Sequence, residues 1–193
     1  MQLSTFRNLV LASLLLLAPL QPAAAAGTGV DPTLRRLLIA AINDSSSFHD
    51  RFDAEVWLSD MSSRLDRYMP DPASRLEFLR LVHAEATRAD VPPELVLAVI
   101  DVESHFNRWA VSGSGALGLM QVMPFWLTEI GRPDDNLMNA ATNLRLGCTI
   151  LKYYIDMESG NLRKALARYN GSLGNRRYPD KVFDLLSTRW YQQ

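Results

Sequence analysis

Glu103 is the residue with the clearest capacity for chemistry, because it follows an apolar run over residues 95–102 that only Asp101 interrupts. At helical spacing it lies four residues beyond Val99 and three beyond Ile100, on an apolar face. A carboxyl group in such a place loses hydration, which raises its pKa. A carboxylic acid still protonated near neutral pH can donate a proton to a leaving oxygen, such as that of a glycosidic bond. The alternative is that Glu103 marks the solvated end of a helix, and this stretch alone does not decide between them.

The segment that follows, residues 107–118, is rich in glycine and serine. Loops of this composition bring backbone amides and hydroxyl groups close to a ligand. Ser112 and Ser114 could therefore hydrogen-bond Glu103 or an acetamido group of a sugar.

Residues 119–124 add the amide of Gln121 to a set of pliable apolar side chains. This mixture suits a sugar ring, which has an apolar face and a polar rim. The alternative is that Met120 and Met123 fill the core, as methionine usually does.

Three ordered blocks of sequence carry a family resemblance. They read E-S-x-F-N-x-x-A-V-S-x-x-G-A-x-G-L-M-Q-x-M-P over 103–124, N-L-x-x-G-x-x-x-L over 143–151, and A-L-A-x-Y-N-G over 165–171. Over about residues 85–185 the chain resembles the catalytic domain of the soluble lytic transglycosylases. The resemblance implies a lysozyme-like helical fold and cleavage of the β-1,4 bond between N-acetylmuramic acid and N-acetylglucosamine in peptidoglycan.

Carried over by position, the resemblance gives roles to single residues. Glu103 would protonate the leaving oxygen and then, as a base, take the proton from the muramic C6 hydroxyl, which closes on C1 to give a 1,6-anhydro end. Ser112 would orient Glu103 or hold the acetamido group. Tyr169 matches a tyrosine that hydrogen-bonds near the acid, and Asn170 its neighbour in the groove. The remaining matches to the family's substrate groove are Gly118, Leu119, Met120 and Gln121.

Two places depart from the family's pattern. Arg108 stands where proline is frequent, and Gly171-Ser172 replaces the more usual alanine-glycine or glycine pair. Both could reshape the groove, so the resemblance leaves the glycan preference open.

A second carboxylate is not evident near Glu103, although ordinary glycosidases pair two across the scissile bond. Asp101 precedes it by two residues, which turns it about 200° away on a helix. Glu129 lies beyond the groove segment, and Asp134 and Asp135 are expected in a solvated turn. This pattern fits anhydro formation, in which the substrate supplies its own nucleophile.

No cofactor or metal is expected. Gly113-x-Gly115-x-x-Gly118 matches a dinucleotide fingerprint in letters, but it follows a buried helix instead of a strand. The side chains of His49, His83, His105 and Cys148 do not share the spacing of metal ligands. Cys148 is most simply a small core residue.

The elements that must position these groups are helices. We expect them over residues 31–42, 52–69, 71–86, 91–104, 119–130 (with Pro124 as a start or a kink), 139–154, 161–169 and 179–190. The predicted fold is all-α, a lysozyme-like helical domain with an N-terminal helical extension. The predicted divisions are a signal peptide over 1–26, the helical extension over 27–80, and the catalytic domain over 81–193.

The first 26 residues indicate export. Arg7 precedes an apolar stretch over 9–20, and alanines 23–26 provide the small residues of a signal cleavage site. The stretch is shorter than the ~20 apolar residues that span a bilayer. We therefore expect a periplasmic protein. Without Arg7 the chain has 19 basic and 21 acidic residues, so its composition gives no case for nucleic-acid binding.

Two alternatives to the transglycosylase stay open. One is a lysozyme-type hydrolase that admits water at C1. The other is a glycan-binding component of a secretion apparatus, against which the set Glu103, Ser112, Gln121, Tyr169 and Asn170 argues. The expected partner is the peptidoglycan strand. We further expect a monomer, with residues 27–80 available for proteins of the cell envelope.

Overall fold

The computed structural model describes residues 47–48, 50–129 and 132–191. The predicted signal peptide and the helix expected over 31–42 lie outside these ranges. The helices are α2 (Arg51–Leu65), α3 (Pro72–Arg88), α4 (Pro93–Ser104), α5 (Phe125–Glu129), α6 (Ala140–Met157), α7 (Leu162–Tyr169) and α8 (Arg177–Leu185), followed by a π-helical turn η1 (Leu186–Trp190). Across the described ranges the β structure amounts to two isolated bridges, so the all-α prediction is confirmed.

The helix starts follow the local sequence. The side chains of Asp50, Asp71, Asn139 and Asn161 each accept a hydrogen bond from the backbone N–H three residues further on. Each of them satisfies a donor that the first helical turn leaves without a partner. Asp71 and Asn139 stand at the starts of the helices predicted over 71–86 and 139–154, so both starts are confirmed.

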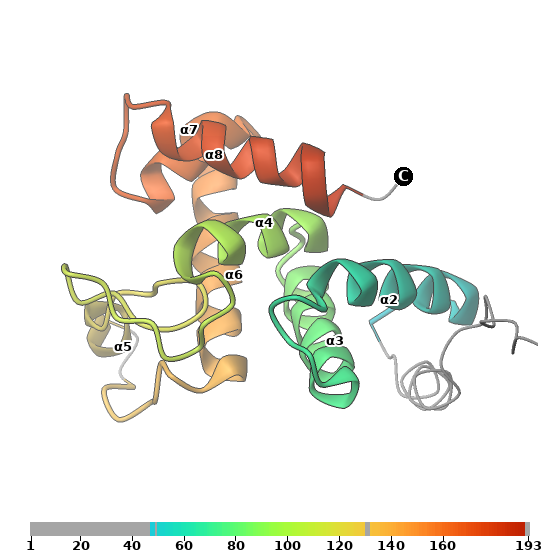
Figure 1. Ribbon diagram of the computed structural model, residues 1–193. Helices are drawn as coiled ribbons and strands as arrows, with labels where there is room; N and C mark the ends of the chain where they lie inside the picture. The colour runs from blue at the N-terminus through green and yellow to red at the C-terminus, as the bar shows by residue number, and fades with distance from the viewer. Residues whose placement is uncertain (1–46, 49, 130–131, 192–193) are drawn as a thin grey trace, which may run out of the picture.

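Helix α4 lies at the centre of the molecule (Figure 1). It packs against α3, α8 and η1, and every side chain from Leu95 to Ile100 is buried. A helix that is apolar on all sides must be enclosed by its neighbours, and this enclosure fixes the end that carries Glu103.

The helix predicted over 119–130 is wrong in its first half. Only Phe125–Glu129 is helical, and the preceding residues form a turn in which Leu117 and Val122 exchange two backbone hydrogen bonds of 3.0 Å. Pro124 disfavours helical geometry in the residue before it, and Gln121 has a left-handed φ of 50°. The final helix also begins two residues before the predicted Pro179 and ends in the π-helical turn.

Helix α2 and the first half of α3 belong to the predicted N-terminal extension, yet they share the core with the rest. Buried side chains of α2 such as Leu58, Met61 and Leu65 are part of it, and α3 runs through the predicted boundary at residue 80. The division at residue 80 stays a prediction. Within the described ranges no helix combines the length and the apolar character needed to cross a membrane.

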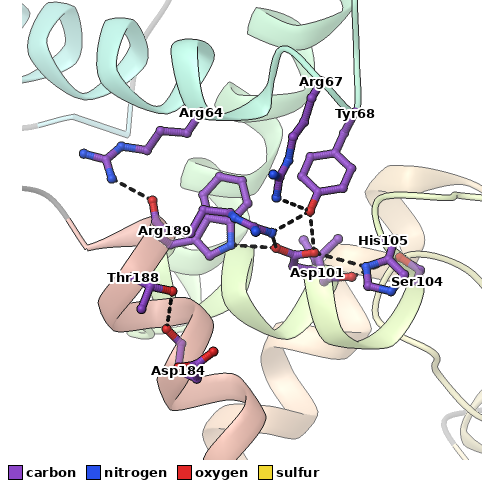
Figure 2. Close-up of polar contacts among 11 residues, drawn as sticks. Arg64, Arg67, Tyr68, Asp101, Ser104, His105, Asp184, Thr188 and Arg189 are labelled. Atoms are coloured by element: carbon purple, nitrogen blue, oxygen red, sulfur yellow. Dashed lines mark hydrogen bonds and ion pairs between the residues drawn. The ribbon is translucent and has the colours of Figure 1, made fainter.

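Asp101 joins three distant parts of the chain on the side of α4 that faces α2 and η1 (Figure 2). Its carboxylate accepts hydrogen bonds from Tyr68 Oη at 2.8 Å, Arg189 Nη1 at 2.7 Å and Trp190 Nε1 at 3.1 Å. His105 Nδ1 lies 3.2 Å away. Burial alone would raise the pKa of Asp101, but these partners together lower it below its usual value. Asp101 is therefore a buried, charged residue whose hydrogen bonds connect α4 to η1 and to the residues that follow α2.

We predict that Asp101→Ala lowers the free energy of unfolding by about 3 kcal/mol, because it removes the buried carboxylate that pairs with Arg189 and leaves Trp190 Nε1 without its acceptor. Urea denaturation followed by circular dichroism measures this loss. Asp134→Ala, at an exposed position, is the control. Equal stability of the two variants would contradict the role given to Asp101.

Candidate active site

Glu103 lies in the last turn of α4 and lines a cavity of about 280 Å³ between the end of that helix and the segment from α7 to α8. The other lining residues are Val102, Asn170, Ser172, Asn175, Arg177, Tyr178 and Lys181. A larger cavity of about 620 Å³, beside Phe52, Trp57 and His83, has none of the predicted site residues in its lining. We place the candidate site at the smaller cavity, since it contains the buried acid.

Burial raises the pKa of Glu103 to about 7. The hydroxyl of Tyr178 donates a hydrogen bond of 2.6 Å to Glu103 Oε1, which acts in the opposite direction by stabilising the charged form. The loss of hydration outweighs this bond. The group can thus be protonated or charged near neutral pH, which is the property a general acid that later acts as a base requires.

The two residues after α4 hold its end in an unusual backbone conformation. His105 has φ 48° and Phe106 has φ 63°, values that non-glycine residues seldom adopt. The Phe106 ring is buried and packs against Tyr68 and other aromatic rings, whereas the mostly exposed His105 contacts Asp101 through Nδ1. The chain thereby reverses direction directly after the acid, where packing sustains the strain.

The hydroxyl groups of Ser104 and Tyr169 hydrogen-bond to the backbone of the turn at 119–120. Ser104 Oγ donates to the carbonyl of Leu119 at 2.8 Å, and Tyr169 Oη donates to that of Met120 at 2.7 Å. Burial, and then the negative charge of Glu103, raise the pKa of Tyr169 well above its usual value. Tyr169 thus lies near the acid, as the resemblance implies, but its hydroxyl binds the backbone.

The loop serines are bonded to their own loop. Ser112 Oγ lies 2.9 Å from Ser114 Oγ and accepts a hydrogen bond of 2.9 Å from the amide of Ala116. Among the residues that the structure describes, Tyr178 and not Ser112 is the hydrogen-bonding partner of Glu103. Contact of Ser112 and Ser114 with a sugar stays a prediction.

The segment 118–121 is packed into the protein. Leu119 and Met120 have buried side chains, and Gln121 Nε2 donates to the carbonyls of Ala110 and Gly118. Gly118 has a left-handed φ of 76°, and a Cβ there would lie 2.4 Å from Asn143 Nδ2. The carbonyls of Leu119 and Met120 already accept hydrogen bonds from Ser104 and Tyr169. The substrate-binding role of this segment stays a prediction.

Asn143 connects α6 to this segment and does not figure among the predicted site residues. Its amide is buried, accepts from the Met120 N–H at 2.8 Å and donates to the carbonyls of Leu117 and Leu137 at 2.8 and 2.9 Å. A buried amide needs several partners. Asn143 has two of them in the turn at 117–122 and the third at Leu137, before α6. Asn143 is the first residue of the sequence block over 143–151, and this position is the sequence feature that could have identified it.

Asn170 lines the cavity, and its contact with substrate stays a prediction, whereas sequence reasoning did not identify Tyr178, Arg177 and Lys181 as residues of the site. The sequence feature that could have pointed to Tyr178 is its place at the start of an amphipathic helix. A tyrosine buried there needs a hydrogen-bonding partner for its hydroxyl. Its partner Glu103 is 75 positions away in sequence, so spacing could not identify the pair.

The other candidate groups have structural surroundings. Cys148 is buried, with its Sγ 3.9 Å from Met120 Sδ, so its predicted place in the core is confirmed. Asp134 is exposed and Asp135 pairs with Arg132, as expected of a solvated turn. Over the described ranges no cluster of three or more histidine, cysteine or acidic residues could hold a metal ion. Gly113 and Gly115 follow α4 and lead into a turn, which is not the strand-to-helix setting of a dinucleotide site.

We predict that Tyr178→Phe raises the pKa of Glu103 above its value of about 7, because it removes the hydrogen bond that favours the charged form. Titration of the Glu103 carboxyl by ¹³C NMR measures the shift. Tyr169→Phe is the matched control, since that hydroxyl binds the carbonyl of Met120. A pKa that stays unchanged or falls in Tyr178→Phe would show that this hydroxyl does not tune the acid.

Two transglycosylases are similar to this chain in sequence. The chain is 33% identical over 115 residues to membrane-bound lytic murein transglycosylase C of Yersinia enterocolitica, an alignment that covers 51% of this chain and 32% of that protein. It is 30% identical over 114 residues to the transglycosylase of Enterobacteria phage PRD1, covering 55% and 42% respectively. A solved structure of an inactive mutant of lytic transglycosylase Slt from Pseudomonas aeruginosa aligns with a TM-score of 0.45 and 23% identity, over 78% of this chain and 31% of that one.

The chain thus spans less than half the length of these relatives. Residues 80–184, more than half of the chain, match the family model described as the transglycosylase SLT domain. This match includes the whole of α4 to α7 and the Glu103 cavity. The chain therefore belongs to the transglycosylase SLT domain family.

Proposed function

We propose that this protein is a peptidoglycan lytic transglycosylase in which Glu103 acts first as the acid and then as the base. The observation that carries the proposal is the burial of Glu103, which raises the pKa of the carboxyl group to about 7 in spite of the opposing hydrogen bond from Tyr178. Family membership supports the substrate class.

The proposed reaction needs one proton carrier. The Glu103 carboxylic acid donates its proton to the oxygen of the leaving N-acetylglucosamine as the bond to muramic C1 breaks. The muramic C6 hydroxyl then bonds to C1 and gives its proton to the Glu103 carboxylate. The acid is regenerated, no water is consumed, and the product has a 1,6-anhydro end.

Attack by the substrate's own hydroxyl is favoured by the charge arrangement of the cavity. Glu103 is the one carboxyl group among its described lining residues. Asp101 belongs to the cluster on the side of α4 next to Tyr68 and Arg189 and accepts their hydrogen bonds there. A hydrolase that admits water at C1 is the alternative, and its product differs. A pure glycan-binding role has less support, because acids in a cavity with a pKa shifted towards neutrality cluster at catalytic sites.

The pH dependence follows from the raised pKa. Proton donation requires the protonated form of Glu103, and this form is lost as the pH rises through about 7. Cleavage should therefore slow on the alkaline side of neutrality.

We also propose that the chain is exported. The segment of Arg7, residues 9–20 and alanines 23–26 has the order of a secretory signal. Fractionation of expressing cells checks this proposal: mature protein, shortened by these residues, is expected in the periplasm. Full-length protein confined to the cytoplasm would refute it.

Digestion of purified peptidoglycan tests the reaction. We expect muropeptides with 1,6-anhydro ends, each lighter by one water than its hydrolysed counterpart, as measured by mass spectrometry. Glu103→Gln should lower the rate about 100-fold or more, because an amide cannot donate the proton.

Glu129→Gln, the same substitution at an exposed position outside the cavity, is the control and should keep full activity. Free reducing ends without anhydro ends would favour the hydrolase. Full activity of Glu103→Gln would remove this residue from the mechanism.

A further inference from the structure

The wall of the Glu103 cavity formed by α8 carries two positive charges. Arg177 and Lys181 both line the cavity and lie four residues apart on α8, so they share one face of that helix. Arg177 is also the first residue of α8, which places the positive end of the helix dipole at the same wall.

These charges are not neutralised by acids in the structure described. The nearby acid Asp180 forms ion pairs with Arg163 and Arg176. Within the described ranges, no acidic side chain forms an ion pair with Arg177 or Lys181. Glu103 itself is the one acid in the lining, and burial leaves it partly uncharged near neutral pH. The cavity therefore has an excess of positive charge.

Ser172 adds a further polar residue to the cavity wall. Its residue lines the cavity, and its Oγ is buried without a hydrogen-bonding partner in the part of the chain described. The amides of Asn170 and Asn175 extend the same polar wall.

We propose that Arg177 and Lys181 bind a carboxylate carried by the muramoyl residue of the substrate, beside the bond that Glu103 cuts. This inference rests on the proposed function and names the feature of the glycan that the site selects. N-acetylmuramic acid differs from N-acetylglucosamine by a lactyl ether that ends in a carboxyl group. That carboxylate is free in peptide-free strands, and in substituted strands the stem peptide supplies others. A guanidinium is well suited to either, since it binds carboxylates through paired hydrogen bonds.

The consequence is discrimination by charge. A neutral chitin-type strand has the same sugar backbone but no carboxylate. Arg177 and Lys181 therefore add no ion-pair contribution to the affinity for such a strand. The expected specificity is for muramoyl glycans, with binding that weakens as salt screens the exposed charges.

The test uses Glu103→Gln protein, which binds without turnover, and titration calorimetry at low salt. The probes are a peptide-free muramoyl tetrasaccharide, the same tetrasaccharide with stem peptides, and both compounds with their carboxylates converted to amides. Adding Arg177→Gln and Lys181→Gln should weaken binding of the carboxylate probes about tenfold, since each partly exposed charge contact contributes a few-fold. Binding of the amidated probes should not change.

Arg176→Gln is the matched control, because Arg176 neighbours Arg177, is paired with Asp180 and lies outside the lining. A loss confined to the peptide-free probe assigns the lactyl carboxylate, and a loss confined to the substituted probe assigns the stem peptide. An equal loss for the amidated probes, no loss for any probe, or no binding of the carboxylate probes would overturn the proposal. Failure of the wild-type protein to cleave peptidoglycan would refute the proposed function separately, since binding is measured without turnover.

Discussion

The buried charge of Asp101 is the constraint on which the placement of the site depends. A charge enclosed by protein is tolerated when several donors meet it, and here they come from Tyr68, His105, Arg189 and Trp190. These donors lie at the end of α2, after α4 and in η1. Satisfying one carboxylate therefore fixes the rotation of α4 and with it the direction in which Glu103 points.

The last two turns of helix α4 thus carry two acids, Asp101 and Glu103, in opposite electrostatic environments. Burial acts on both, but Asp101 has enough hydrogen bonds to keep its pKa low, whereas Glu103 has the hydroxyl of Tyr178 and a raised pKa. Separating the pKa values of neighbouring acids in this way is how proteins assign different roles to the same chemical group. One acid holds the structure and the other is available for proton transfer.

Local sequence was sufficient to predict α4 and the helix starts near Asp71 and Asn139, because each depends on residues within a few positions. The raised pKa of Glu103 was one of two alternatives for that stretch, and the enclosure by the segment from α7 to α8 decides between them. Local sequence could not predict the partners of Glu103 and Asp101, since Tyr178 and Arg189 approach α4 through tertiary packing. The helix predicted at 119–124 fails for a similar reason: hydrogen bonds with Leu117 and Asn143 outweigh the apolar periodicity of that segment. Family resemblance placed Tyr169 near the acid but did not give its bond to the Met120 carbonyl.

The two phenols around Glu103 have an effect on how the site responds to protons. Burial, followed by the negative charge of Glu103, raises the pKa of both Tyr169 and Tyr178 well above the usual value. Both rings consequently stay neutral while Glu103 gains or loses its proton. The Glu103 carboxyl group then titrates separately from the two phenols and not as one member of a coupled set. Its apparent pKa can therefore be assigned to a single residue.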